Sequence, residues 1–230
     1  MSGRLLVIAT PIGNLADASP RMIEAIRRCS RLYCEDTRHT RKLLQHFGLE
    51  VPLASLHEYN EEAKLARVVA ELEEGATIGL VSDAGTPLLS DPGFPLVREA
   101  RRRGVAIEPI PGPFAAAAAL AISGIPPLPF AFFGFPPHRR GERLSFYREV
   151  AAHAMTAVVY ESPQRIVASL EDAAEVLGDV EATVARELTK LHEEILHGTV
   201  RELAATLAAR ETIRGEITVV FAAAAAAERA

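Results

Sequence analysis

Apolar residues along the chain occur in short continuous runs that alternate with longer amphipathic stretches. The first run, Leu5–Ala9, has the length of a strand and ends at Pro11 and Gly13, which is typical of a buried parallel strand. Ser19 and Pro20 then supply the N-cap and the first residue of a helix. Further strands are predicted at Leu32–Cys34, Thr77–Val81 and Ala106–Ile110, with helices at Arg38–His46, Glu61–Glu73 and Asp91–Arg103. This alternation predicts a mostly parallel sheet covered by helices.

Proline and glycine concentrate between Pro111 and Pro129, on both sides of an alanine-rich helix. Such a segment is typical of a hinge between domains. Beyond it, the pattern predicts strands at Phe130–Phe133, Thr156–Tyr160, Thr183–Arg186 and Glu216–Phe221, and helices at Arg165–Leu177 and Val200–Ala208, the latter with a Thr199–Glu202 capping box. We therefore predict two α/β domains, 1–124 and 125–230, with parallel or mixed sheets and a ligand cleft between them.

Composition narrows the class of protein. With 49% apolar and 24% charged residues, the 230-residue chain is too apolar to be disordered. Apolar runs fall short of the ~20 residues that span a bilayer, and no metal-ligand spacing occurs, so we expect neither a membrane nor a metal partner. Cys29 and Cys34 match no disulfide or redox pattern and indicate buried thiols in the cytoplasm.

The net charge of −5 disfavours general binding of nucleic acid. Four segments nevertheless are rich in arginine, and each of them is either a solvated helix face or part of a surface that holds phosphates. They are residues 27–31, 38–42, 101–103 and 138–148.

Candidate chemistry lies in the loops at the carboxyl ends of strands, where open α/β sheets bind ligands. Residues 10–15 hold one glycine and match no dinucleotide or phosphate loop. Residues 82–93 are mostly small, which lets the backbone approach a flat ligand, and Asp83 can accept from an amine or a ribose hydroxyl. Glu35 and Asp36 are adjacent carboxylates that Arg38 can engage, although a helix cap at Asp36 or Thr37 is the alternative.

In the second domain, Tyr160–Pro163 and Ala185–Lys190 end strands with ionisable groups, for which surface ion pairs are the alternative. The blocks ATPIGNLADAS, CEDTRHT, LVSDAGTPLLSDPG, PIPGPFA, YESPQRI and ARELTKLHEE resemble, in order, those of the ribosomal RNA small subunit methyltransferase I family. That family belongs to the tetrapyrrole-methylase superfamily of S-adenosylmethionine enzymes, and the resemblance runs from about Leu5 to about Phe221.

The resemblance implies a two-domain α/β homodimer that holds S-adenosylmethionine between its domains. It also implies 2′-O-methylation of a cytidine in 16S ribosomal RNA of the small subunit, near the decoding centre. The implied cofactor-binding residues are Thr10, Pro11, Asp83, Thr86, Leu88, Phe114, Ala115, Tyr160, Ala185 and Glu216. The implied substrate-binding residues are Glu35, Asp36, Arg38, Arg186 and Lys190.

Two departures from the family pattern concern binding. Phe114 stands where the family usually has Ser, so a hydroxyl contact to the cofactor is lost there. Many relatives continue into a small C-terminal helical module, whereas this chain ends in an alanine tail. We expect the second departure to affect binding to the ribosomal particle more than methyl transfer.

The catalytic base stays open at this point. Methyl transfer needs alignment of the nucleophile and the methyl group, and a proton acceptor should help a ribose hydroxyl. The candidates are Glu35, Asp36, Glu161, Glu187 and Lys190. Two alternative functions are methylation of a tetrapyrrole or protein side chain on the same fold, and a non-catalytic ribosome assembly factor.

Overall fold

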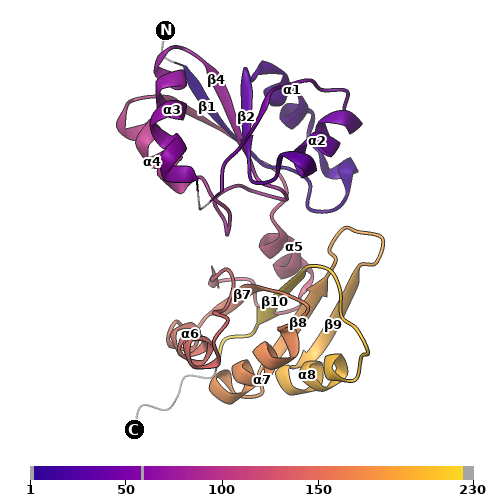
Figure 1. The fold of residues 1–230 in the computed structure, drawn as a ribbon. Helices are drawn as coiled ribbons and strands as arrows, with labels where there is room; N and C mark the ends of the chain where they lie inside the picture. Colours follow the sequence, from indigo (N-terminus) through magenta and orange to yellow (C-terminus); the bar gives the residue numbers. More distant parts are fainter. Residues whose placement is uncertain (1–2, 58–59, 225–230) are drawn as a thin grey trace. The chain divides into compact units, whose positions relative to one another are not determined.

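The computed structural model describes residues 3–57 and 60–224. Contacts between residues divide the chain into two units, 1–114 and 115–230, and each unit contains one five-stranded sheet (Figure 1). The division falls after residue 114, whereas the sequence led us to expect it after residue 124. The difference comes from the alanine-rich helix, which packs on strands of the second sheet.

The first unit is built on a wholly parallel sheet with strand order β3-β2-β4-β1-β5. Its strands are β1 (Arg4–Ile8), β2 (Arg31–Cys34), β3 (Leu53–Ser55), β4 (Thr77–Val81) and β5 (Ala106–Ile110). Its helices are the 3-10 turn η1 (Leu15–Asp17), α1 (Pro20–Arg28), α2 (Thr37–His46), α3 (Glu61–Glu73) and α4 (Phe94–Arg102). The α/β class predicted from the alternating pattern is confirmed.

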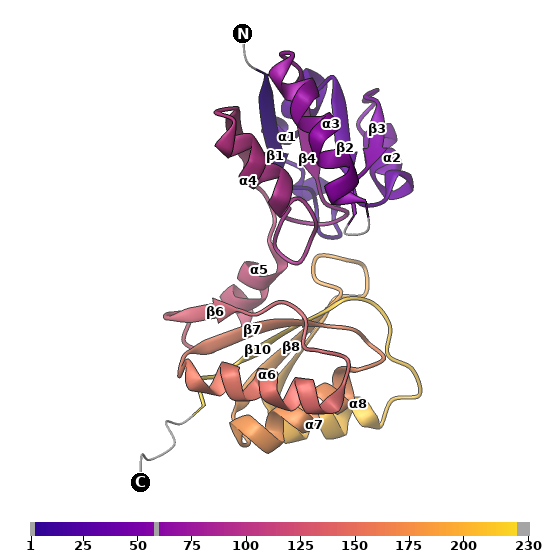
Figure 2. The ribbon, with the colours of Figure 1, turned by 60° about the vertical axis from the view of Figure 1, so that its left-hand side comes forward.

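Strand β1 is buried on both faces of this sheet. Leu5 packs in a core that includes residues of α3 and α4, whereas Leu6 and Ile8 pack in a second core with residues of α1 and α2. Helices therefore cover both faces, as Figure 2 shows for α3 and α4 on one side and α1 on the other. Burial on both faces explains why the sequence of β1 is a continuous apolar run rather than an alternating one.

The second unit is built on a mixed sheet with strand order β6-β7-β10-β8-β9, in which only the β6–β7 pair is parallel. Its strands are β6 (Phe130–Phe132), β7 (Thr156–Glu161), β8 (Glu181–Arg186), β9 (Glu194–Thr199) and β10 (Ile217–Phe221). Its helices are α5 (Ala115–Ile122), α6 (Arg140–Ala152), α7 (Ile166–Leu177) and α8 (Val200–Ala208). Helices α6, α7 and α8 cover one face of the sheet, and α5 lies on the other (Figure 2).

Several local signals are confirmed, and others were missed. The Ser19 hydroxyl caps α1 by accepting the N–H of Met22 at 3.0 Å, and the Thr199–Glu202 capping box is present. Helix α4 begins at Phe94 rather than Asp91 because Gly93 has φ +122°. Strands β3 and β9 and helix α6 were not predicted, since β3 has three residues and β9 mixes charged and small residues at a sheet edge.

Candidate active site

Three loops of the first unit are joined by hydrogen bonds at the carboxyl ends of its strands. Thr10 follows β1 and Gly85 follows β4, and each N–H donates to the carbonyl of the other, at 2.9 and 3.1 Å. The Thr10 hydroxyl also donates to the carbonyl of Ser82 at 3.3 Å. The Thr86 hydroxyl donates to the carbonyl of Pro113, after β5, at 3.0 Å. Both threonine hydroxyls, expected at the cofactor, therefore hold the loops together.

The loop between β4 and α4 has a strained backbone. Leu88 and Ser90 have φ angles of +76° and +73°, a region that costs a residue other than glycine about 1–3 kcal/mol. The N–H of Gly93 donates to the buried carboxylate of Glu61 at 2.7 Å and fixes the end of the loop. Leu88, a predicted cofactor residue, is thus held in a conformation that the surrounding contacts must maintain.

Acidic side chains gather on these loops. Asp83 accepts the backbone N–H of Asp36 at 3.0 Å, which joins the loops after β4 and β2. Burial, together with the nearby carboxylates of Glu35 and Asp83, raises the pKa of Asp91 to about 7. Asp91 was not among the predicted site residues, although it is the second carboxylate of the 82–93 loop. A cluster of carboxylates is suited to bind a ligand that carries positive charge.

Asp36 and Arg38 form a closed local pair. The carboxylate of Asp36 caps α2 by accepting the N–H of Arg38 at 2.8 Å. It also accepts two hydrogen bonds from Arg38 Nε, at 3.0 and 3.1 Å, and one from Nη2, at 2.7 Å. These bonds lower the pKa of Asp36 to about 2, so this carboxylate is a weak proton acceptor. The Arg38 side chain is 85% exposed and remains accessible to a large partner.

The loop after β5 passes close to the end of β1. A Cβ placed on Gly112 would lie 2.9 Å from the Cβ of Ala9, so only glycine allows this approach. Pro11, another predicted cofactor residue, is buried, whereas Phe114 is half-buried. The close backbone approach agrees with a platform for a flat ligand.

In the second unit, three residues of the central strands share one face of the sheet. The strand register places Tyr160 and Ala185 on either side of Thr218. Their neighbours Val159, Val184 and Val219 belong to the core with α6, α7 and α8. Because side chains alternate along strands, Tyr160 and Ala185 face the α5 side of the sheet. Ala115 is the first residue of α5, so three predicted cofactor residues belong to this side.

Glu161 has a structural role. Its side chain is buried, and one carboxylate oxygen accepts from the N–H of Ser162 at 2.7 Å and from Arg165 Nη2 at 2.6 Å. The other oxygen is buried with no hydrogen-bond partner among the described residues. An ion pair in this position holds the turn between β7 and α7.

Lys190 links two acidic residues at the same end of the second sheet. Its ammonium lies 2.8 Å from carboxylate oxygens of both Glu187 and Glu216. Against the effect of burial, these hydrogen bonds raise the pKa of Lys190, and hydrogen bonds from Lys190 and the Glu216 N–H lower that of Glu187. Lys190 therefore stays charged and is unsuited to act as a base. Glu187 and Thr189 have φ angles of +53° and +65°, so this loop is also strained.

Arg186 directs its guanidinium group toward the protein. Its Nε donates to Glu194 at 2.9 Å, and its two terminal nitrogens donate to the carbonyls of Arg214 and His192, each at 3.2 Å. Arg186, which was predicted to bind substrate, ties together the segments before β9 and before β10.

Most arginines of the four basic segments are paired with carboxylates. Arg28 pairs with Glu108 at 3.1 Å, and Arg103 pairs with Glu99 at 2.8 Å. Other pairs are Arg27–Glu24, Arg31–Glu71, Arg102–Glu99, Arg139–Glu142, Arg140–Glu175 and Arg143–Asp172. These segments contribute less positive surface than their sequence indicates.

Membrane-spanning helices and metal-binding clusters are both absent from the described part of the chain. No helix there is long and apolar enough to cross a membrane. No group of three or more His, Cys, Asp or Glu side chains there could hold a metal ion. Cys29 and Cys34 are buried free thiols, and burial raises the pKa of both.

Comparison with known proteins gives the family. Residues 4–204 match the family model described as Tetrapyrrole (Corrin/Porphyrin) Methylases. The protein named ribosomal RNA small subunit methyltransferase I from Xylella fastidiosa is 46% identical over 95% of this chain and 81% of its own length. The protein of the same name from Thermotoga maritima is 38% identical over 95% of this chain and 98% of its own length.

Solved structures show the same fold at lower identity. Diphthine synthase aligns with a TM-score of 0.73 and 16% identity, over 96% of this chain and 90% of its own. Uroporphyrin-III-C-methyltransferase from Thermus thermophilus aligns with a TM-score of 0.64 and 18% identity, over 95% and 94%. The fold, the family model and the relatives agree, and the chain therefore belongs to the ribosomal RNA small subunit methyltransferase I family of the tetrapyrrole methylases.

Proposed function

We propose that this chain transfers a methyl group from S-adenosylmethionine to the ribose 2′-oxygen of a cytidine in 16S ribosomal RNA of the small subunit. The observation that carries the proposal is 38–46% identity to relatives named ribosomal RNA small subunit methyltransferase I. Methyltransferases of this family use S-adenosylmethionine as methyl donor. The proposal goes beyond the family in naming the ribose 2′-oxygen of a cytidine as the atom that is methylated.

The residues of the first unit fit this cofactor. When bound, S-adenosylmethionine supplies a methyl group on a positively charged sulfur. Glu35, Asp83 and Asp91 form a carboxylate cluster in which burial, and after it repulsion from Glu35 and Asp83, raises the pKa of Asp91. A cationic ligand relieves that repulsion, so this cluster is suited to it. We assign the residues predicted from the sequence to the cofactor site: Thr10, Pro11, Asp83, Thr86, Leu88 and Phe114 in the first unit, and Ala115, Tyr160, Ala185 and Glu216 in the second.

Asp83 has the geometry of a direct ligand. One of its carboxylate oxygens accepts the N–H of Asp36, and the other has no hydrogen-bond partner among the described residues. The second oxygen can accept from an amine or a hydroxyl group of the cofactor. Thr10 and Thr86 contribute indirectly, because their hydroxyls hold the loops that carry Asp83.

The choice of a proton acceptor follows from the ion pairs and hydrogen bonds that the candidate residues already make. Asp36 and Glu187 have lowered pKa values, and Lys190 stays charged. Glu161 is buried in its pair with Arg165. Of the five candidates this leaves Glu35, and we place the proton acceptor there, in the cluster with Asp83 and Asp91.

Arg38 is the best placed of the predicted substrate contacts. Its guanidinium group is exposed, and Asp36 fixes its direction. A phosphate held by such a group positions RNA without reading its sequence. Recognition of one cytidine then depends on the shape of the assembled small subunit.

The other functions are less well supported. Methylation of a protein side chain or of a tetrapyrrole would agree with diphthine synthase and uroporphyrin-III-C-methyltransferase, but these share only the fold, at 16% and 18% identity. A non-catalytic assembly factor would not need the strained loop at Leu88 and Ser90. Location in the cytoplasm and assembly as a homodimer remain predictions.

The position of the methyl group provides the test. Small subunits from a strain that lacks the enzyme are incubated with the protein and S-adenosylmethionine labelled in its methyl group. We expect a labelled dinucleotide that resists alkali and begins with cytidine, because a 2′-O-methyl group removes the nucleophile that cleaves the adjacent phosphodiester. Label on a base or on ribosomal protein would contradict the ribose assignment. Labelling of a porphyrin precursor would favour the tetrapyrrole alternative.

A further inference from the structure

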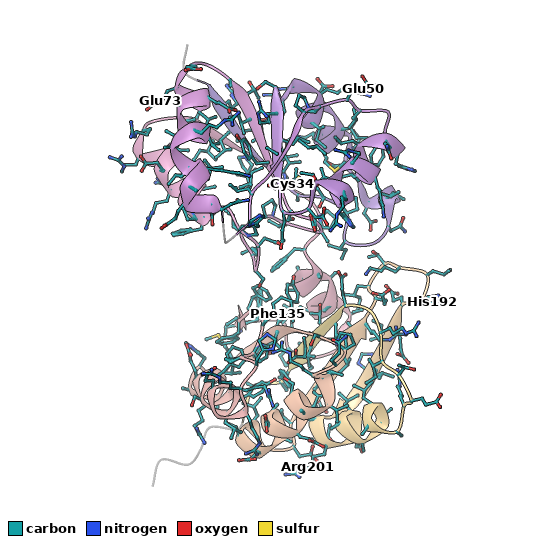
Figure 3. All side chains as sticks on the ribbon, in the orientation of Figure 1. Cys34, Glu50, Glu73, Phe135, His192 and Arg201 are labelled. Atoms are coloured by element: carbon teal, nitrogen blue, oxygen red, sulfur yellow. The ribbon has the colours of Figure 1, made fainter. Side chains whose placement is uncertain are left out.

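A pocket of about 460 Å³ opens at one end of the second sheet. Its walls come from the segment between β8 and β9 and from the segment that precedes β10. The lining includes three arginines, Arg186, Arg210 and Arg214, together with Glu187, His192 and Thr212. His192, labelled in Figure 3, lies at the outer edge of this unit.

The pocket is held in shape by an ion-paired frame. Arg186 donates to the carbonyls of His192 and Arg214, one on each wall. Arg210 makes two hydrogen bonds of 2.7 Å to Glu194, and Arg186 donates to the same carboxylate at 2.9 Å. Two guanidinium groups thus share one carboxylate, and both walls are fixed before any ligand binds.

The charge of the lining is positive. Three arginines line the pocket against one carboxylate, Glu187, which shares the Lys190 ammonium with Glu216. Arg214 is exposed, and among the described residues no carboxylate lies within ion-pair distance of its guanidinium group. Arg214 therefore differs from most arginines of the four basic segments, which are paired. A concave site with an uncompensated guanidinium group and a preformed frame suits a phosphate-sized anion.

We propose that this pocket binds a backbone phosphate of the RNA substrate. Arg214 contacts the phosphate, while Arg186 and Arg210 position the walls. The inference rests on the proposed function, which gives RNA as the class of ligand. The pocket lies at the same end of the sheet as Glu216, two residues after Arg214, so a phosphate held there places the RNA backbone beside the residues assigned to the cofactor.

The test measures how binding depends on salt. Binding of the protein to small subunits that lack the modification is followed between about 50 and 200 mM salt, where counterion release dominates. For Arg214→Ala we expect about tenfold weaker binding at low salt, as for the loss of one charged hydrogen bond. The slope of log affinity against log salt should fall by about 0.7–0.9, as for one lost phosphate contact. Arg214→Lys should keep most of the slope.

Arg201→Ala is the matched control, because Arg201 is exposed on α8 at the far end of the same unit (Figure 3). It should leave affinity and slope unchanged. A slope for Arg214→Ala equal to that of wild type would overturn the proposal. Weaker binding with an unchanged slope would assign Arg214 to a protein contact and overturn it equally. Affinity for S-adenosylmethionine, measured on the same variant, should be unchanged and shows that the fold is intact.

The result is independent of where the methyl group goes. If Arg214→Ala lowers the slope but the label appears on a base, the phosphate pocket stands and the ribose assignment fails. If the label appears on ribose and the slope does not change, the pocket fails and the ribose assignment stands.

Discussion

At the scale of single residues, the raised pKa of Asp91 gives a prediction about stability. Its pKa of about 7 lies above the value of about 3.9 expected in an unfolded chain. The folded state therefore disfavours the charged form, and the contribution of Asp91 to stability falls as the pH rises from 4 to 7.

We expect Asp91→Asn to raise the free energy of unfolding at pH 8 by about 1–2 kcal/mol and to have little effect near pH 4. The figure is smaller than the full shift would give, because solvent screens a partly exposed carboxylate. Denaturant unfolding at the two pH values measures the difference. The exposed Asp17, changed to Asn, serves as the control. An equal effect of Asp91→Asn at both pH values would show that ionisation is not the cause.

The same scale shows what sequence reasoning can find at a site. Polar residues of the loops at the strand ends were recognised from the sequence, and the interaction of Arg38 with Asp36 was predicted from their spacing. The partners of Thr86 and Arg186 were not, because Pro113 and Arg214 lie 27 and 28 residues away in the chain. A hydroxyl group has one rotatable donor and a guanidinium group has five, and only the folded chain decides which acceptors they reach.

At the scale of elements, helix α6 shows why a charge pattern can mislead. Its sequence, RGERLSFYREVAA, begins as part of an arginine-rich segment, yet Leu144, Tyr147 and Val150 form a buried stripe. Arg143 is itself buried, and its guanidinium group pairs with Asp172 of α7 at 2.6 Å. The positive charge of Arg143 therefore stabilises the contact between α6 and α7, and the composition of the segment does not reveal this.

The buried pair gives a prediction at this scale. Arg143→Ala leaves the carboxylate of Asp172 buried with only the exposed Arg140 to pair with it. We expect a loss of about 3–5 kcal/mol in the free energy of unfolding, the usual effect of breaking a buried ion pair on one side. Arg139→Ala removes an arginine that is 86% exposed and should cost less than about 0.5 kcal/mol.

Replacing both partners separates charge from packing. Arg143→Met together with Asp172→Leu removes both buried charges at similar volume and should recover much of the loss. Urea unfolding of the four proteins compares them. If Arg143→Ala and Arg139→Ala had the same effect, the pair at Asp172 would contribute nothing to stability.

At the scale of the whole molecule, the different construction of the two sheets explains what could be predicted from the sequence. The parallel sheet of the first unit follows from continuous apolar strands such as β1, whose two faces are both covered. The second unit was harder, because β9 is an edge strand with the sequence EILHGT and pairs only with β8. Helix α5 was expected before the boundary, but Ala116, Ala119 and Leu120 are buried and the helix packs on the second sheet. Small residues on all sides of a helix do not indicate which sheet it covers.

Cofactor binding by the whole protein gives the last prediction. A cation bound beside Glu35, Asp83 and Asp91 favours the charged form of Asp91, so its pKa should fall below 7 on binding. Binding of S-adenosylmethionine near pH 7 should therefore release a fraction of a proton and tighten as the pH rises from 6 to 8. Calorimetry in two buffers of different ionisation enthalpy measures the number of protons released. The release should approach zero in Asp91→Asn and persist in Asp17→Asn, because only the first variant removes the titrating group. Equal proton release in Asp91→Asn and wild type would place the cation away from this cluster and overturn the assignment of the first-unit loops to the cofactor.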